Sequence, residues 1–328
     1  MIQFTAFGLL GLLALSIPVG VVLFLLAFGI DFFFSPFPLM RGLGQVVWSS
    51  SNSATLIAIP LFVLLGEILV RSGVANRTYA ALDKWVSWLP GGLVHANIAT
   101  STMFSATSGS SVATAATVAT VAMPQARELG YNEKLFSGAI AAGGTLGIMI
   151  PPSINLIIYG LLTDTSVPEL YLAGFLPGLL LALLFMATVA IACMFRPKWD
   201  GDPVPQDWGA KIRSLSGLLP PLLIFLVVVG SIYAGVATPT EAGAVGVLGA
   251  LGISFVRGTL TLRAFLGSLE EAALATSFLL MIAVGSSVMG FSVDFLSMPQ
   301  ELVTVVKQMN LSDIGLFAAI VILFLVLG

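Results

Sequence analysis

The chain has 328 residues, of which 58% are hydrophobic and only 9% are charged, and its formal net charge is −3. Soluble domains carry about 25% charged residues, so this composition excludes an ordinary water-soluble protein. A net charge this small implies no highly charged partner, and we expect no binding to nucleic acid.

Apolar runs of membrane length recur along the chain and predict a polytopic, all-α membrane protein in a lipid bilayer. We expect spans at 4–30, 53–70, 135–162, 167–195, 216–235, 239–256, 272–292 and 311–328. The stretch 91–124 is also apolar, but it is rich in Ser, Thr, Ala and Gly.

The positions of the basic residues decide how 91–124 meets the membrane. If the N-terminus is cytoplasmic and this stretch enters and leaves on the same side, 11 of the 13 Lys and Arg residues are cytoplasmic. If 91–124 crossed the membrane once, Arg127 and Lys134 would lie on the opposite side of the membrane from Arg71, against the positive-inside rule. We therefore predict a re-entrant hairpin at 91–124, with its tip near 108–110.

The span 135–162 contains a break. Residues 143–155 read GGTLGIMIPPSIN, and Pro151 and Pro152 cannot continue a helix because proline lacks the amide hydrogen and clashes with the preceding turn. Freed carbonyl groups are tolerated at membrane depth only where protein surrounds them or they line a cavity. The sequence therefore predicts a broken helix at 135–162 that forms part of a binding site.

A weak internal repeat relates the two parts of the chain. Displacing the sequence by 221 residues places Pro18 on Pro239 with opposite membrane orientation, which predicts an inverted repeat. We expect 1–195 to be the first repeat and the polar stretch 196–215 to be a cytoplasmic linker. We expect 216–328 to be an incomplete second repeat that ends within hairpin two, the counterpart of the hairpin at 91–124. The alternative is that the chain ends on a whole span. If the repeat is incomplete, the chain by itself would lack a full substrate site.

Five motifs together resemble the large membrane subunit of TRAP transporters, the DctM-like family. They are SATSGSSVATAA at 105–116, GGTLGIMIPPS at 143–153, LAGFLPG at 172–178, IPLFVLLGE at 59–67 and ATPTEAGA at 237–244. The resemblance implies an elevator-type transporter of the bacterial or archaeal cytoplasmic (inner) membrane that imports organic acids coupled to sodium. It also implies two partners, a small membrane subunit and a periplasmic solute-binding protein that selects the carboxylate.

The resemblance also implies a set of sodium ligands. They are Ser108, Ser110, Gly147, Ile150 and Pro152, the last three through main-chain carbonyl groups. Hydroxyl and carbonyl oxygens are hard ligands suited to a monovalent cation. Small residues in this region also permit close helix packing, which is the alternative interpretation.

For the carboxylate substrate, the predicted residues are Asn155, Ser110 and Thr145. Asn155 follows the break, where the N-terminus of a restarted helix favours anions. Its alternative role is to cap that helix.

The remaining chemistry argues against an enzyme. One His and one Cys, about 100 residues apart, make neither a catalytic triad nor a zinc site, and no nucleotide-binding or HExxH motif occurs. Glu67 is followed four residues later by Arg71, which favours a structural ion pair. The alternative to a transporter subunit is a non-transporting membrane scaffold or a channel component.

Overall fold

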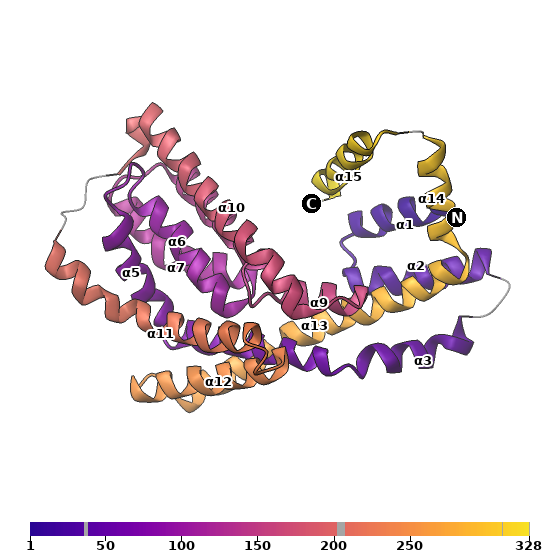
Figure 1. Cartoon of the computed structure of the whole chain (residues 1–328), viewed down its shortest axis with the longest axis horizontal. Helices are drawn as coiled ribbons and strands as arrows, with labels where there is room; N and C mark the ends of the chain where they lie inside the picture. The colour runs from indigo at the N-terminus through magenta and orange to yellow at the C-terminus, as the bar shows by residue number, and fades with distance from the viewer. Residues whose placement is uncertain (36–38, 202–206, 310, 328) are drawn as a thin grey trace. The chain divides into compact units, whose positions relative to one another are not determined.

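The computed structural model describes residues 1–35, 39–201, 207–309 and 311–327, without the side chains of Ser108, Val326 and Leu327. In these ranges the chain forms helices and no strand (Figure 1). The chain forms two compact units. One comprises Met1–Asn52 with Phe278–Gly328, and the other comprises Ser53–Ser277. This division does not follow the predicted repeat boundary, and the inverted repeat stays a prediction.

The first unit consists of helices from both ends of the chain. They are α1 (Ile2–Ala14), α2 (Val19–Phe34), α3 (Met40–Ser51), the end of α13 (Leu262–Phe295), α14 (Met298–Gln308) and α15 (Asp313–Leu327).

The prediction of one span at 4–30 is wrong, because the chain reverses between α1 and α2. Ser16 has a left-handed backbone, with φ 59°, and Pro18 precedes α2. The ring of Phe4 near the start of α1 then packs edge-to-face against Phe34 at the end of α2, 5.4 Å between centroids. A proline-containing reversal inside an apolar run leaves hydropathy unchanged, so hydropathy alone did not reveal the turn.

The second unit begins with a short 3₁₀ turn and continues through the bulk of the apolar chain. Its elements are η1 (Ala54–Ile57), α4 (Ala58–Arg71), α5 (Val74–Val86), α6 (Leu93–Ser108), α7 (Ser111–Glu128), α8 (Glu133–Met149), α9 (Ile154–Thr163), α10 (Val167–Phe195), η2 (Pro197–Trp199), α11 (Trp208–Tyr233), α12 (Pro239–Val256) and the start of α13.

Five helical segments in the described chain are long and apolar enough to cross a membrane: η1 with α4, α10, α11, α12 and α13. The pair α8 and α9 makes a sixth if it is counted as one bent span. The bounds of α10 and α12 equal the predicted spans, whereas α11 begins at Trp208, within the predicted linker 196–215. The span predicted at 311–328 corresponds to the shorter apolar helix α15.

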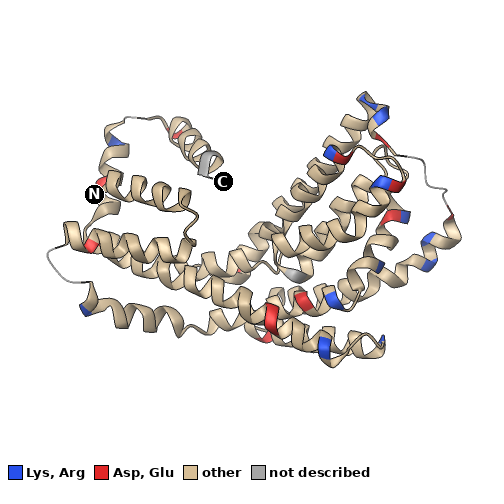
Figure 2. Cartoon of the chain, turned by 180° about the vertical axis from the view of Figure 1, so that it is seen from behind, with Lys and Arg blue, Asp and Glu red and all other residues tan. Residues whose placement is uncertain are grey.

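Polar residues at the helix starts account for several of these boundaries. Thr238 and Glu241 form a capping box at α12. Ser166 and Glu169 have the same spacing at the start of α10, but Ser166 makes no side-chain cap. Glu67 pairs with Arg71 at 3.7 Å, in agreement with the predicted ion pair. Lys and Arg lie mainly toward the end of the second unit where α10 ends and α11 begins (Figure 2).

Helix α6 lies at the centre of the second unit and packs against α4, α5, α7, α8, α10 and α11. Its approach to α8 is close because a Cβ atom added at Gly143 would lie 2.8 Å from the Ser101 hydroxyl oxygen. Gly144 is similarly close to Ala115 on α7. These small residues bring α6, α7 and α8 together, and they place the end of α6 in a buried position.

Candidate functional site

Helices α6 and α7 form the predicted hairpin, and its tip lies at 108–110. Gly109 ends α6 in the left-handed region, with φ 63°, which glycine adopts without steric cost. Ser110 then begins α7 as its N-cap, because its hydroxyl oxygen accepts a hydrogen bond from the N–H of Ala113 at 3.3 Å.

The base of the hairpin is closed by hydrogen bonds. The N–H of Leu93, the first residue of α6, donates to the hydroxyl oxygen of Tyr131, just past α7, at 3.1 Å. The N–H of Gly91 donates to Asp200 Oδ2 at 3.2 Å. Both ends of the hairpin therefore lie at one end of the unit, as a re-entrant hairpin requires.

The predicted break in the following helix is also present. Helix α8 ends at Met149, Ile150 has extended backbone angles, and α9 continues at an angle of 41°. Ser153 joins the two halves, because its hydroxyl donates to the carbonyl oxygen of Ile148 at 2.6 Å and accepts from the N–H of Leu156 at 3.4 Å. Ser153 therefore caps the second half-helix, the role that the alternative interpretation gave to Asn155.

The tip of the hairpin touches the break. The N–H of Ile154 donates to the carbonyl oxygen of Gly109 at 3.4 Å. A Cβ atom on Gly109 would lie only 2.7 Å from the carbonyl oxygen of Pro152. The two interruptions therefore form one structural site.

Gly147 provides a second contact, one turn earlier on α8. A Cβ atom added there would lie 3.2 Å from the backbone of Ser110 and Ser111 and 3.3 Å from the hydroxyl oxygen of Ser105. Four of the predicted sodium ligands, Ser110, Gly147, Ile150 and Pro152, thus belong to the joined tip and break. The Ser108 backbone ends α6 here, and its side chain lies outside the described residues.

Ser105 is a candidate that the sequence reasoning missed. Its side chain is fully buried, its hydroxyl oxygen has no hydrogen-bond partner, and it faces Gly147. A buried hydroxyl without a partner is costly, so its presence needs an explanation. The available signal was its spacing, since Ser105 lies one helical turn before Ser108 and on the same face.

The two remaining predicted residues lie on exposed surface. Thr145 is exposed on α8, and its hydroxyl donates to the carbonyl oxygen of Ala142 at 2.7 Å. Asn155 is exposed in the first turn of α9. Neither side chain belongs to the buried contact between tip and break, and both remain accessible to a ligand from outside it.

The helix ends give this region a divided electrostatic character. Helices α6 and α8 end here, so their unpaired carbonyl groups carry partial negative charge. Helices α7 and α9 begin here, so their first N–H groups carry partial positive charge. One site can therefore hold a cation against the carbonyl groups and an anion beside the N-termini.

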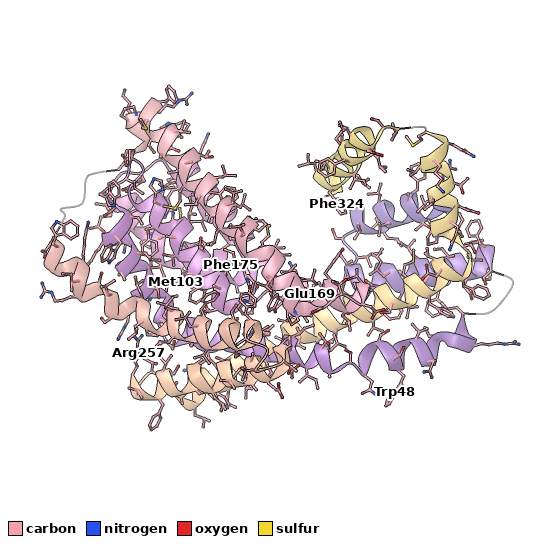
Figure 3. The ribbon with its side chains drawn as sticks, viewed as in Figure 1. Trp48, Met103, Glu169, Phe175, Arg257 and Phe324 are labelled. Carbon is pink, nitrogen blue, oxygen red and sulfur yellow. The ribbon has the colours of Figure 1, made fainter. Side chains whose placement is uncertain are left out.

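Two of the larger cavities of the second unit lie outside the contact between tip and break, although Ile150 borders one of them. A cleft of about 780 Å³ lies at the starts of η1, α10 and α12, and it contains none of the predicted residues. An apolar cavity of about 560 Å³ lies between α6, α10 and α11, and Ile150 lines it together with Met103 and Phe175. Figure 3 labels Met103 and Phe175. Polar groups are nearly absent from its walls, so the cavity does not extend the ion-binding chemistry.

Comparison with known proteins gives a family match over residues 6–328. The matching family is described as "Tripartite ATP-independent periplasmic transporter, DctM component". The match includes the hairpin, the broken helix and all predicted site residues.

Individual relatives agree with the family match. The chain is 32% identical to the sialic acid TRAP transporter large permease protein SiaM of Vibrio cholerae, over 98% of this chain and 75% of that protein. It is 31% identical to the ectoine large permease TeaC of Halomonas elongata, over 97% and 74%. It is 33% identical to the C4-dicarboxylate large permease DctM of Pseudomonas aeruginosa, over 88% and 67%.

Proposed function

We propose a specific transport function from one premise: the chain belongs to the family of the DctM component of tripartite ATP-independent periplasmic transporters. It is therefore a multi-pass membrane protein and a subunit of a transporter, not an enzyme. Beyond this, we propose that it is the large membrane subunit of a sodium-coupled importer of organic acids that works by an elevator movement.

The contact between the hairpin tip and the broken helix carries the sodium proposal. The unpartnered Ser105 hydroxyl faces Gly147, and the carbonyl group of Ile150 has left the helical pattern. Neutral hydroxyl and carbonyl oxygens with two helix C-termini suit a single positive charge of low density. No cluster of three or more His, Cys, Asp or Glu residues occurs among the described residues, so a divalent metal has less support.

Organic acids are the proposed substrates. Relatives named for sialic acid and for C4-dicarboxylates support this class, whereas the relative named for ectoine shows that the family's substrates vary. In this chain, Asn155 in the first turn of α9 and Thr145 on α8 are exposed beside the break, where the start of α9 favours a carboxylate.

The family implies a small membrane subunit and a periplasmic binding protein as partners. We propose that the binding protein delivers the organic acid and that the complex resides in the inner membrane. A large subunit that exposes many apolar side chains on its membrane helices is consistent with a membrane-embedded partner and with lipid contact.

Uptake into proteoliposomes tests the function. The chain is reconstituted with the small subunit and binding protein, and radiolabelled organic acids are supplied with an inward sodium gradient or with choline in its place. We expect saturable uptake that depends on sodium. Equal uptake in choline would reject sodium coupling, and ion current without solute uptake would favour a channel component.

A pair of serine variants locates the coupling ion. Ser105→Ala removes the unpartnered hydroxyl and should weaken sodium activation by on the order of 5- to 150-fold. The matched control is Ser137→Ala, because Ser137 is exposed on α8 and its hydroxyl donates to the carbonyl oxygen of Glu133. The same sodium activation in both variants would remove Ser105 from the site.

A further inference from the structure

Buried polar atoms without partners are concentrated in one part of the fold. Among the described residues, 11 buried side-chain nitrogen or oxygen atoms lack a hydrogen-bond partner, and nine of these lie on α5 and α6. Besides Ser105, the group on α6 includes Asn97, Thr100 and Ser101. Native proteins pair nearly all such atoms, so a group of this size calls for partners that the two helices themselves do not supply.

Asn97, Thr100 and Ser101 share one face of α6. They are spaced i, i+3 and i+4, which places neighbouring side chains one above the other on a helix. Each is at most 1% exposed. This face points toward α8, because the Ser101 hydroxyl oxygen would lie 2.8 Å from a Cβ atom added at Gly143 of α8.

The opposite face of α6 has a different character. Met103 and Thr102 line the apolar cavity, and the Thr102 hydroxyl donates to the carbonyl oxygen of Ile98 at 2.8 Å. A hydroxyl on this helix can therefore be satisfied by its own backbone. Thr100 and Ser101 on the polar face do not form this bond, which leaves their oxygens free for another partner.

The free atoms have the chemistry of a cation site. Three of the four unpartnered atoms on Asn97, Thr100 and Ser101 are neutral oxygens, and the fourth is the Asn97 amide nitrogen. Helix α5 packs against α6, and it also carries a buried carboxylate oxygen without a partner, on Asp83. Oxygen ligands with a carboxylate on the adjacent helix favour a positive ion over an anion.

We propose that Asn97, Thr100 and Ser101 form a second monovalent-cation site on α6, between the hairpin tip and its base. The inference rests on the proposed sodium site at the tip. Ser101 precedes Ser105 by four residues, about 6 Å along the helix axis. Two cations this close repel each other, so an ion at the second site favours release of the ion at the tip.

Sodium-dependent thermal stabilisation of the purified chain tests the second site. Sodium that binds the folded chain raises its melting temperature relative to choline, and the rise depends on affinity. Ser101→Ala and Asn97→Leu should each reduce this rise, with a loss of affinity on the order of tenfold. In choline their melting temperatures should equal or exceed that of the wild type, because a buried unpartnered group has been removed.

The matched control is Thr102→Val on the opposite face of α6, which should leave the sodium-dependent rise unchanged. An undiminished rise in both Ser101→Ala and Asn97→Leu would overturn the second site and assign the polar face to bound water. Ser101→Ala removes a single oxygen atom and therefore remains informative if Asn97→Leu does not fold.

Binding of radioactive sodium to the purified chain separates the two proposals. We expect Ser105→Ala and Ser101→Ala each to lower the amount bound and their combination to lower it further. A loss with Ser105→Ala alone would overturn the second site and leave the tip site intact. A loss with Ser101→Ala alone would support the second site and reject Ser105 as a ligand.

Discussion

The N–H of Ile154 donates a hydrogen bond of 3.4 Å to the carbonyl oxygen of Gly109, which joins the first turn of α9 to the tip of the hairpin. Each of these residues lies at an interruption that would be costly at membrane depth by itself. The hydrogen bond makes the position of one interruption depend on the other. A substitution at the tip should therefore also change the position of the residues at the break.

Gly109→Ala tests this dependence. Alanine at φ 63° is strained by about 1–2 kcal/mol, and its Cβ atom would also lie 2.7 Å from the carbonyl oxygen of Pro152. We expect a lower melting temperature and weaker sodium stabilisation. Gly130→Ala is the control, since Gly130 has φ 70° and no atom within 4 Å of its added Cβ.

The difference between the two alanine variants measures the contact, because the left-handed strain is common to both. We expect Gly109→Ala to be the more destabilising by about 1–3 kcal/mol, the usual cost of overpacking. Equal melting temperatures would show that the tip and the break separate readily.

Gly147→Ala tests the packing of α8 against the tip. The added Cβ atom would lie 3.2 Å from the backbone of Ser110 and Ser111, so the tip must shift by a few tenths of an ångström. We expect sodium affinity to fall about tenfold, equivalent to about 1.4 kcal/mol. Gly138→Ala on the same helix meets nothing within 4 Å and should preserve sodium affinity. Equal affinities in the two variants would contradict the placement of the ion beside Gly147.

The break and the hairpin were predictable because local residue chemistry and the positions of charged residues indicate them without tertiary contacts. Pro151 and Pro152 cannot continue a helix, so the break follows from residue chemistry. The hairpin and its tip followed from the positions of Lys and Arg along the chain. The apolar runs predicted the bounds of α10 and α12. Local chemistry also explains the capping box at Thr238.

Features that depend on tertiary contacts were not predictable in this way. The reversal between α1 and α2 lies within a continuous apolar run, where either one span or two helices satisfy hydropathy. In the sequence, only the spacing of Ser105 from Ser108 distinguishes it from other small helical residues. Its significance comes from the absence of a partner and the proximity of Gly147, which only the packed helices reveal.

Tyr131→Phe tests the base of the hairpin. The variant removes the hydroxyl that accepts the Leu93 N–H, and it leaves a buried donor without a partner. We expect a destabilisation of about 1–3 kcal/mol, measured as a lower melting temperature. Tyr159→Phe is the control because Tyr159 is exposed on α9 and should change stability little. A Tyr131→Phe protein as stable as the control would show that this bond does not hold the hairpin base.

Asp83 provides a prediction for pH. It lies on α5, which is not among the membrane-length apolar helices, and burial raises the pKa of its carboxyl group from 3.8 to about 6 although Lys84 acts in the opposite direction. The folded chain therefore binds more protons than the unfolded chain between about pH 4 and pH 6, and this group's contribution to stability falls as pH rises through that window.

We expect Asp83→Asn to raise the melting temperature at pH 7.5 relative to the wild type and to flatten its decline between pH 4 and pH 7. The reason is that the amide removes a negative charge that burial disfavours, while one carboxylate oxygen has no partner to compensate. Glu128→Gln changes an exposed carboxylate at the end of α7 and is the matched control. A wild-type pH profile retained in Asp83→Asn would show that another group controls stability in this range.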